Sequence, residues 1–229
     1  MPAFAGFPKD TLKFLDELAA NNSREWFTNH KPRYEASVVA PSLTLIENLR
    51  KPLDKVAPML RVEAKKMGGS LMRIYKDTRF SKDKTPYKTN IGIQFRHTAG
   101  KDVHAPGIYI HIATDECFVG AGMWKPPSEP LAKIRCKIDA FPIGWRKARD
   151  NKRFATFYSL YDDRLKSAPR GYAKDHPEIS DLRLRSFIGG APLTRAQVQG
   201  TQLVDLIVER VRAATPLMTF LCEALELPY

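Results

Sequence analysis

Few cysteines and no long hydrophobic run limit the classes of protein that fit this sequence. The three cysteines, Cys117, Cys136 and Cys222, are widely spaced and form no CxxC pair, so a disulfide framework is not expected. No stretch approaches the roughly 20 apolar residues that span a bilayer. The N-terminus lacks the basic region followed by an apolar one that a secretory signal needs. We therefore expect a cytoplasmic protein with reduced thiols and no membrane partner.

The short motifs of several enzyme classes are also missing. The sequence has no P-loop, no GxGxxG turn and no GxSxG nucleophile elbow. Its histidines, cysteines and acidic residues show no spacing typical of metal ligands. We therefore expect no metal and no cofactor. Whether the protein is an enzyme is left open by the sequence.

Negative charge is scarce, because 25 Asp and Glu residues stand against 37 Lys and Arg residues, a formal net charge of +12. A positive field of this size attracts anions over a Debye length of about 8–10 Å. Phosphates, nucleic acid and acidic metabolites all fit such a field, and the net charge does not choose among them. A basic surface without a dedicated partner fits as well.

The hydrophobic pattern predicts a single α+β domain over residues 1–229, in which helices flank an antiparallel meander. Residues 9–58 should be mainly helical. Asn22 and Glu25 have the spacing of an N-cap and the third residue of a capping box, so a helix is expected to begin there. Pro41 is expected to interrupt the helical run that follows.

Alternating and β-branched residues predict a sheet-rich part, residues 70–124, with about four to five strands in all. Helices should resume from residue 128 to 229, with one further strand near 184–188 and a helix break near Pro216. The expected strands of the meander are residues 71–75, 90–97, 107–113 and 116–122.

Strand parity gives the predicted sheet one apolar and one polar face. Ile91, Ile93 and Phe95 share a face, and burial should pair them with the isoleucines of the next strand. Gly120 and Gly122 leave bare backbone on the polar face, which permits close approach of a ligand. The side chains expected together on the polar face are Arg73, Tyr75, Gln94, Arg96, Tyr109 and His111.

The segment 73–88, RIYKDTRFSKDKTPYK, combines six cations and two aspartates with three aromatic rings. Charges this dense are tolerated when they pair with one another or meet an external anion. We predict a basic, aromatic-lined site for a small ligand that carries phosphate or carboxylate, bound by guanidinium forks and oriented by phenol groups. A solvated sheet face is the alternative. The predicted ligand-binding residues are Arg73, Tyr75, Arg79, Lys84, Lys88, Gln94, Arg96, Tyr109 and Trp124.

His111 and Asp77 are the candidate catalytic residues. An imidazole titrates near neutrality, so His111 could act as a general acid or base, or it could be a hydrogen-bonded strand residue without a chemical role. Asp77 lies between Lys76 and Arg79, and its carboxylate is either a base or the partner in an ion pair that orders the loop.

Two further functions fit the sequence. The basic run of residues 145–154 would place Arg146, Arg149 and Arg153 on one helical face, and with the 73–88 loop it could bind nucleic acid. A solvated helix face also explains this run. In the second alternative, the charges of 73–88 form a structural ion-pair lattice, and an unknown protein partner binds elsewhere.

Several motifs resemble one known family. Asn21-Asn22-x-Arg24-Glu25-Trp26-Phe27 and the long motif of residues 73–88 have the order and separation found in domain-of-unknown-function family 2461, which is bacterial and fungal. The likeness covers nearly the whole chain. It implies membership and brings no established activity with it. Further matching motifs are Pro106-Gly107-x-Tyr109-x-His111-Ile112, Gly120-x-Gly122-Met123-Trp124-x-Pro126 and Ile134-Arg135.

Overall fold

The computed structural model describes residues 2–79, 81–100 and 105–229, and it confirms the predicted α+β fold with an antiparallel sheet. The elements are α1 (Lys9–Ala20), α2 (Arg24–Tyr34), the π-helix η1 (Glu35–Val39), α3 (Ala40–Val56), β1 (Ile91–Arg96), β2 (Gly107–Ile112), β3 (Cys117–Met123), α4 (Ser128–Ala140), α5 (Pro142–Arg149), α6 (Lys152–Phe157), β4 (Ser159–Leu160), α7 (Ile179–Leu182), β5 (Phe187–Pro192), α8 (Arg195–Gln199) and α9 (Leu203–Ala224).

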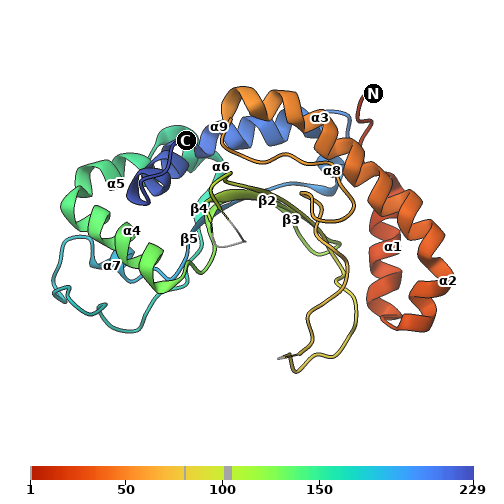
Figure 1. Ribbon diagram of the computed structural model, residues 1–229, viewed down its shortest axis with the longest axis horizontal. Coiled ribbons are helices and arrows are strands. Elements are labelled where there is room, and N and C mark those ends of the chain that lie inside the picture. The colour runs from red at the N-terminus through yellow and green to blue at the C-terminus, as the bar shows by residue number, and fades with distance from the viewer. Residues whose placement is uncertain (1, 80, 101–104) are drawn as a thin grey trace.

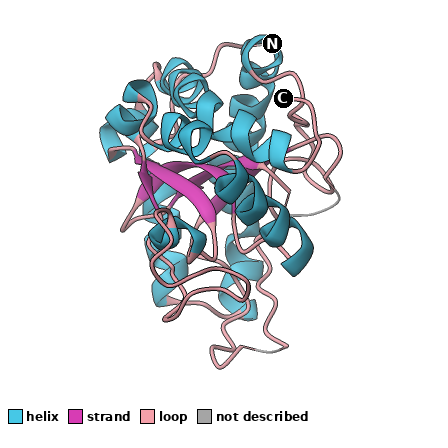
Figure 2. Cartoon of the chain, turned by 90° about the vertical axis from the view of Figure 1, so that its left-hand side faces the viewer, coloured by secondary structure: helices cyan, strands magenta, loops and turns pink. Residues whose placement is uncertain are grey.

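The sheet forms an arch beneath α3 and α9 (Figure 1). The helices α1 and α2 stand at one end of the arch, and α4, α5 and α7 lie at the other. Figure 2, turned by 90°, shows the strands beneath a layer of helices, with long loops extending from the opposite side. None of the helices in the described ranges combines the length and apolar character of a membrane span.

The helix α2 begins one residue later than predicted. Ser23 is its N-cap, and its hydroxyl accepts a hydrogen bond from the backbone N–H of Trp26 at 3.2 Å. The prediction that Asn22 caps this helix is therefore wrong. The Asn22 amide instead makes two hydrogen bonds to the backbone of Tyr87. An amide can donate and accept at once, so this pairing satisfies two backbone groups where a cap would satisfy one.

Pro41 disturbs the helix as expected, without ending it. The chain stays helical from Arg24 to Val56, with the π-helical turn η1 just before Ala40. Pro41 has no N–H to offer the carbonyl of Ser37, four residues earlier. That carbonyl instead accepts the hydroxyl of Thr11 at 2.6 Å. The fully buried Thr11 thereby links α1 to η1 and supplies a donor for the carbonyl that Pro41 cannot serve.

The sheet has the strand order β1-β2-β3-β5-β4, and its neighbouring strands are antiparallel. Ile93 lies opposite Ile110, and Phe95 lies opposite Ile108, so the predicted apolar residues share one face. These four side chains are fully buried in one cluster with the leucines of α3 and α9. Each contributes roughly 1.5–3 kcal/mol by leaving water.

Three local predictions are wrong. Residues 71–75 form no regular strand, because only Leu71 and Tyr75 make isolated bridges, to Ile93 and Tyr87. The further strand is β5, which runs through the glycine pair 189–190 instead of ending before it. No break occurs at Pro216, since α9 continues through it with buried residues on both sides. Core packing there outweighs the cost of about 3 kcal/mol for a proline inside a helix.

The basic run 145–154 is divided between α5 and α6, so the predicted single face with Arg146, Arg149 and Arg153 does not form. Buried carboxylates neutralise its first half. Asp181 forms a salt bridge with Arg149 and accepts a hydrogen bond from the indole N–H of Trp145 at 2.7 Å. Glu178 lies 3.4 Å from the Arg146 guanidinium.

We expect Asp181→Ala to lower the free energy of unfolding by about 3 kcal/mol, because it removes one partner of a largely buried ion pair and leaves the Trp145 N–H without an acceptor. Asp150→Ala is the matched control. Asp150 pairs with the same Arg149 on the exposed side, so its loss should cost less than about 1 kcal/mol. Urea unfolding of both variants measures the difference, and equal losses would contradict this role for Asp181.

Candidate functional site

Two sequence motifs that lie far apart in the chain meet at α2. The Asn22 side chain donates to the Tyr87 carbonyl at 3.0 Å and accepts the Tyr87 N–H at 3.1 Å. The ring of Phe27 stacks on Tyr87 with 4.2 Å between centroids. Together these contacts hold the Tyr87 end of the segment against the start of α2, and the segment extends below the arch of the sheet (Figure 1).

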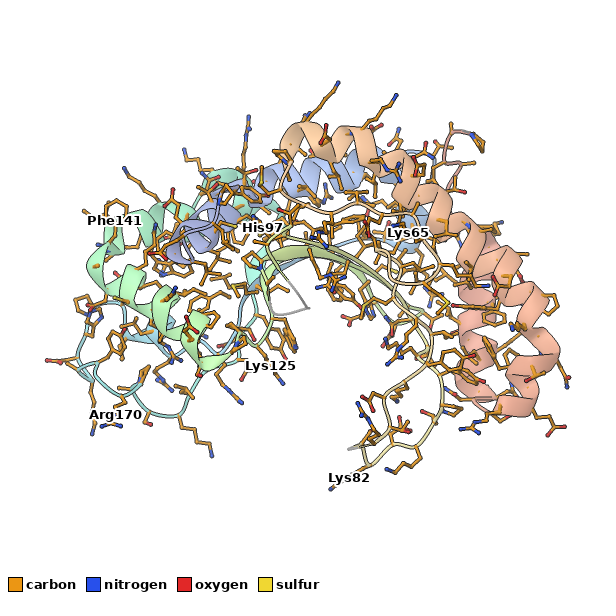
Figure 3. The ribbon with its side chains drawn as sticks, viewed as in Figure 1. Lys65, Lys82, His97, Lys125, Phe141 and Arg170 are labelled. Carbon is orange, nitrogen blue, oxygen red and sulfur yellow. The ribbon has the colours of Figure 1, made fainter. Side chains whose placement is uncertain are left out.

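The segment folds back on itself as it leaves the sheet. The Lys76 N–H donates to the Pro86 carbonyl at 2.9 Å, and the Lys88 N–H donates to the Ile74 carbonyl at 2.8 Å. These bonds flank the bridge between Tyr75 and Tyr87. Figure 3 shows that Lys82 lies at the far tip of the segment, away from the sheet.

A groove of about 590 Å³ separates this segment from α2, and we call it the basic groove. Helix α2 and its N-cap residue contribute an arginine and two hydroxyl residues, and the segment contributes two lysines and the ring of Tyr75. The residues that line the basic groove are Ser23, Arg24, Thr28, Tyr75, Lys76, Thr78, Lys84, Pro86 and Tyr87.

Two cations of the 73–88 segment pair with its own aspartates. Asp77 accepts hydrogen bonds from Arg79 at 2.8 and 3.0 Å, and these bonds lower the pKa of Asp77 to about 2. Lys76 pairs with Asp83, and this bond likewise lowers the pKa of the Asp83 carboxyl. Both aspartates are therefore ionised near neutral pH, and Asp77 is a weak base there.

Four other cations near the groove form no salt bridge within the described residues, and they are Arg24, Arg73, Lys84 and Lys88. The Lys84 ammonium donates to the Thr78 carbonyl at 2.9 Å. The Lys88 ammonium donates to the Arg73 carbonyl at 3.2 Å, and burial together with the neighbouring Arg73 charge lowers the pKa of Lys88. The internal ion pairs thus leave part of the positive charge available to an external anion.

A second hollow, of about 780 Å³, lies on the concave face of the sheet, and we call it the sheet hollow. Its floor includes Gly120 and Gly190, which are directly paired between β3 and β5. Gln94 and Tyr109 border it from β1 and β2. The other residues that line it are Met72, Ala105, Gly107, Ile108, Glu116, Cys117, Phe118, Gly122, Trp124, Tyr161, Ile188, Gly189 and Pro192.

His111 lies beside the sheet hollow in a hydrogen-bonded group. The Tyr109 hydroxyl is 3.2 Å from His111 Nδ1, and the Asn90 amide donates to that hydroxyl at 3.3 Å. The imidazole stacks on Phe118 with 4.9 Å between ring centroids. If the hydroxyl donates to Nδ1, the proton of the neutral ring is on Nε2, 4.0 Å from the Glu116 carboxylate. Burial lowers the pKa of His111 and favours this neutral form.

The structure divides the predicted site residues between the two hollows. Tyr75 and Lys84 line the basic groove, whereas Gln94, Tyr109 and Trp124 line the sheet hollow. A single shared hollow does not form, because the chain leaves the sheet after Met72 and turns toward α2. The remaining candidates line neither hollow, and they are Arg73, Arg79, Arg96, Lys88, Asp77 and His111.

Sequence reasoning missed residues of both hollows. Ser23 and Arg24 were interpreted only as part of a helix start. The repeated Asn21-Asn22 before them could have suggested that an asparagine side chain bonds to a distant segment. Tyr161 was missed because β4, which ends just before it, was not expected, and Ile188 was missed because the strand predicted near 184–188 was not expected to pair with β3. No group of His, Cys, Asp and Glu in the described ranges could hold a metal ion.

We expect the pH dependence of stability to report on His111. Its lowered pKa means that the unfolded chain binds a proton more readily, so stability is present above the ordinary value of 6.5 and is lost as the pH falls toward the folded pKa. The slope should be at most about 1.4 kcal/mol per pH unit. Urea unfolding of wild type and His111→Gln between pH 5 and 8 measures it. Identical slopes in the two proteins would contradict the assignment.

A family model described as "Conserved hypothetical protein (DUF2461)" matches residues 10–220. No curated protein and no solved structure matches the chain.

Proposed function

The chain belongs to the DUF2461 family, as its motifs predicted, and we propose that its basic groove binds a small ligand carrying a phosphate or carboxylate group. The observation that carries this proposal is the meeting of the two family-like motifs at one groove. One motif supplies Arg24, and the other supplies Lys76 and Lys84. The volume of about 590 Å³ suits a small molecule.

The groove offers complementary kinds of contact to an anion. Arg24 presents a planar fork that can bind two oxygens at once, and Lys84 is a compact positive charge. Neither forms a salt bridge with a described residue, so an anion need not displace a carboxylate from them. Tyr75, whose side chain is exposed, and Thr78 add hydroxyl groups to the lining. Arg73 and Lys88 reinforce the positive field beside the groove.

We assign the pair Asp77 and Arg79 an ordering role. The Asp77 carboxylate also accepts the backbone N–H of Arg79 at 3.2 Å, which closes a tight turn around Thr78. The Thr78 carbonyl in turn accepts a hydrogen bond from the Lys84 ammonium. The ion pair therefore fixes the part of the segment that presents Lys84 to the groove.

The alternative of nucleic-acid binding through both basic runs has less support. Figure 3 shows Phe141, the residue before α5, and Lys82 at well-separated places on the molecule. Buried Glu178 and Asp181 already pair with Arg146 and Arg149. A surface that binds the phosphate backbone of a nucleic acid would need many accessible cations along one path.

We expect pyrophosphate to raise the melting temperature of wild type, because a ligand that binds only the folded state stabilises it by RT ln(1 + [L]/Kd). Arg24→Ala and Lys84→Ala should each weaken pyrophosphate binding about tenfold or more, since each removes a charge-assisted hydrogen bond of roughly 1.5–3 kcal/mol. Calorimetric titration measures the affinities. Lys82→Ala is the matched control, since it removes an exposed cation of the same segment that does not line the groove.

Three results would overturn the proposal. Pyrophosphate could fail to bind, or Lys82→Ala could lose as much affinity as the groove variants, which would indicate a diffuse field. The third is a single-stranded oligonucleotide that binds more tightly than pyrophosphate, with a logarithmic salt slope of about −4 or steeper. That slope would favour the nucleic-acid alternative.

A further inference from the structure

The sheet hollow differs from the basic groove in its chemistry. Its described lining contains no Lys or Arg, and Glu116 is the one carboxylic acid in it. Aromatic rings, aliphatic side chains and bare glycine backbone make up most of it. A phosphate would find no cation there, so the ligand class that suits the groove does not suit the hollow.

Some glycines of this region are required because a side chain would clash with the fold, and another is not required for packing. A Cβ at Gly122 would lie 2.0 Å from the Phe187 carbonyl oxygen, at a φ of +128°. A Cβ at Gly189 would lie 2.8 Å from the Phe154 ring. Both positions therefore need glycine for packing. At Gly190, a Cβ would meet no atom within 4 Å, so packing does not explain why this position is bare.

Large aromatic side chains remain exposed at the border of the same hollow. Trp124 is 39% exposed and Tyr161 is 51% exposed, and their rings lie 5.1 Å apart. Phe118 and Tyr109 pack edge to face, with 6.1 Å between centroids. Aromatic rings beside bare backbone can stack on a planar molecule.

Gln94 supplies directional polar contact in this lining. No described residue hydrogen-bonds its side-chain amide, although the side chain is partly buried on the concave face. A glutamine amide can donate and accept at adjacent positions, which matches the edge of a heteroaromatic ring such as that of adenine. The Tyr109 hydroxyl lies nearby and is already held by Asn90.

We propose that the sheet hollow binds a small, planar heteroaromatic molecule without negative charge. Its ring lies over the backbone of Gly190 and against the Ile188 and Phe118 side chains that contact the Gly120 position, and its polar edge bonds to the Gln94 amide. The volume of about 780 Å³ is within the range of small-molecule sites. The absence of cations from the described lining and the presence of Glu116 favour a neutral or protonated ring. This inference does not depend on the function proposed for the basic groove.

Saturation-transfer NMR and calorimetry with adenine, indole and cyclohexanecarboxamide test the proposal. We expect adenine to bind wild type more tightly than indole, which lacks the paired edge, and cyclohexanecarboxamide to bind least because it is not planar. Gly190→Leu fills the floor of the hollow and should reduce adenine affinity at least tenfold. Gly190→Ala adds one methyl group and should have a smaller effect. Gln94→Leu should remove the preference for adenine over indole.

Controls separate this site from folding and from the groove. Gly190→Leu should keep or raise the melting temperature, because the position is open and leucine suits a strand better than glycine. Lys84→Ala should leave adenine binding unchanged, so loss of one site is distinguished from loss of the other. The proposal is overturned if none of the probes binds, if a stably folded Gly190→Leu binds adenine like wild type, or if the aliphatic amide binds equally. Sedimentation that shows a dimer abolished by Gly190→Leu would assign the hollow to a second copy instead.

Discussion

Burial of the isoleucine face of the sheet against α3 and α9 is the constraint on which the rest of the structure depends. A slip of β1 by one residue against β2 would expose Ile93 and Phe95 and bury Gln94. The transfer of several large side chains to water, at roughly 1.5–3 kcal/mol each, makes that slip prohibitive. Because side chains alternate along a strand, burial of the isoleucine face also fixes which residues lie on the concave face.

A second constraint decides where the charged segment goes. The Asn22 amide and the Phe27 ring hold Tyr87 against α2, so the chain between residues 75 and 87 cannot continue the sheet. The cations of this segment consequently face α2 and solvent, and the concave face keeps its aromatic and glycine character. The contacts of Asn22 and Phe27 with Tyr87 thus keep the cations of this segment at the basic groove and out of the sheet hollow.

Sequence patterns predicted those features that depend on neighbouring residues in the chain. Strand parity correctly gave the faces of β1 and β2, because a period of two fixes side-chain direction. The contacts that went unpredicted are long-range: Asn22 meets Tyr87 at a separation of 65 residues, and Arg149 meets Asp181 at a separation of 32. Gly189-Gly190 reads as a turn by composition. It lies inside β5 because both neighbouring strands supply pairing partners.

The carboxylates of the protein determine which of its cations can meet an anion. Arg33 is held by Asp10 and Glu17, and its bond to Asp10 lowers the pKa of that carboxyl to about 2. Such pairs remove cations from the available field even though the formal net charge is +12. Arg24 and Lys84 differ because the described residues that line their groove include no carboxylate. The place of the acids, more than the number of bases, therefore decides which of the described cations stay outside salt bridges.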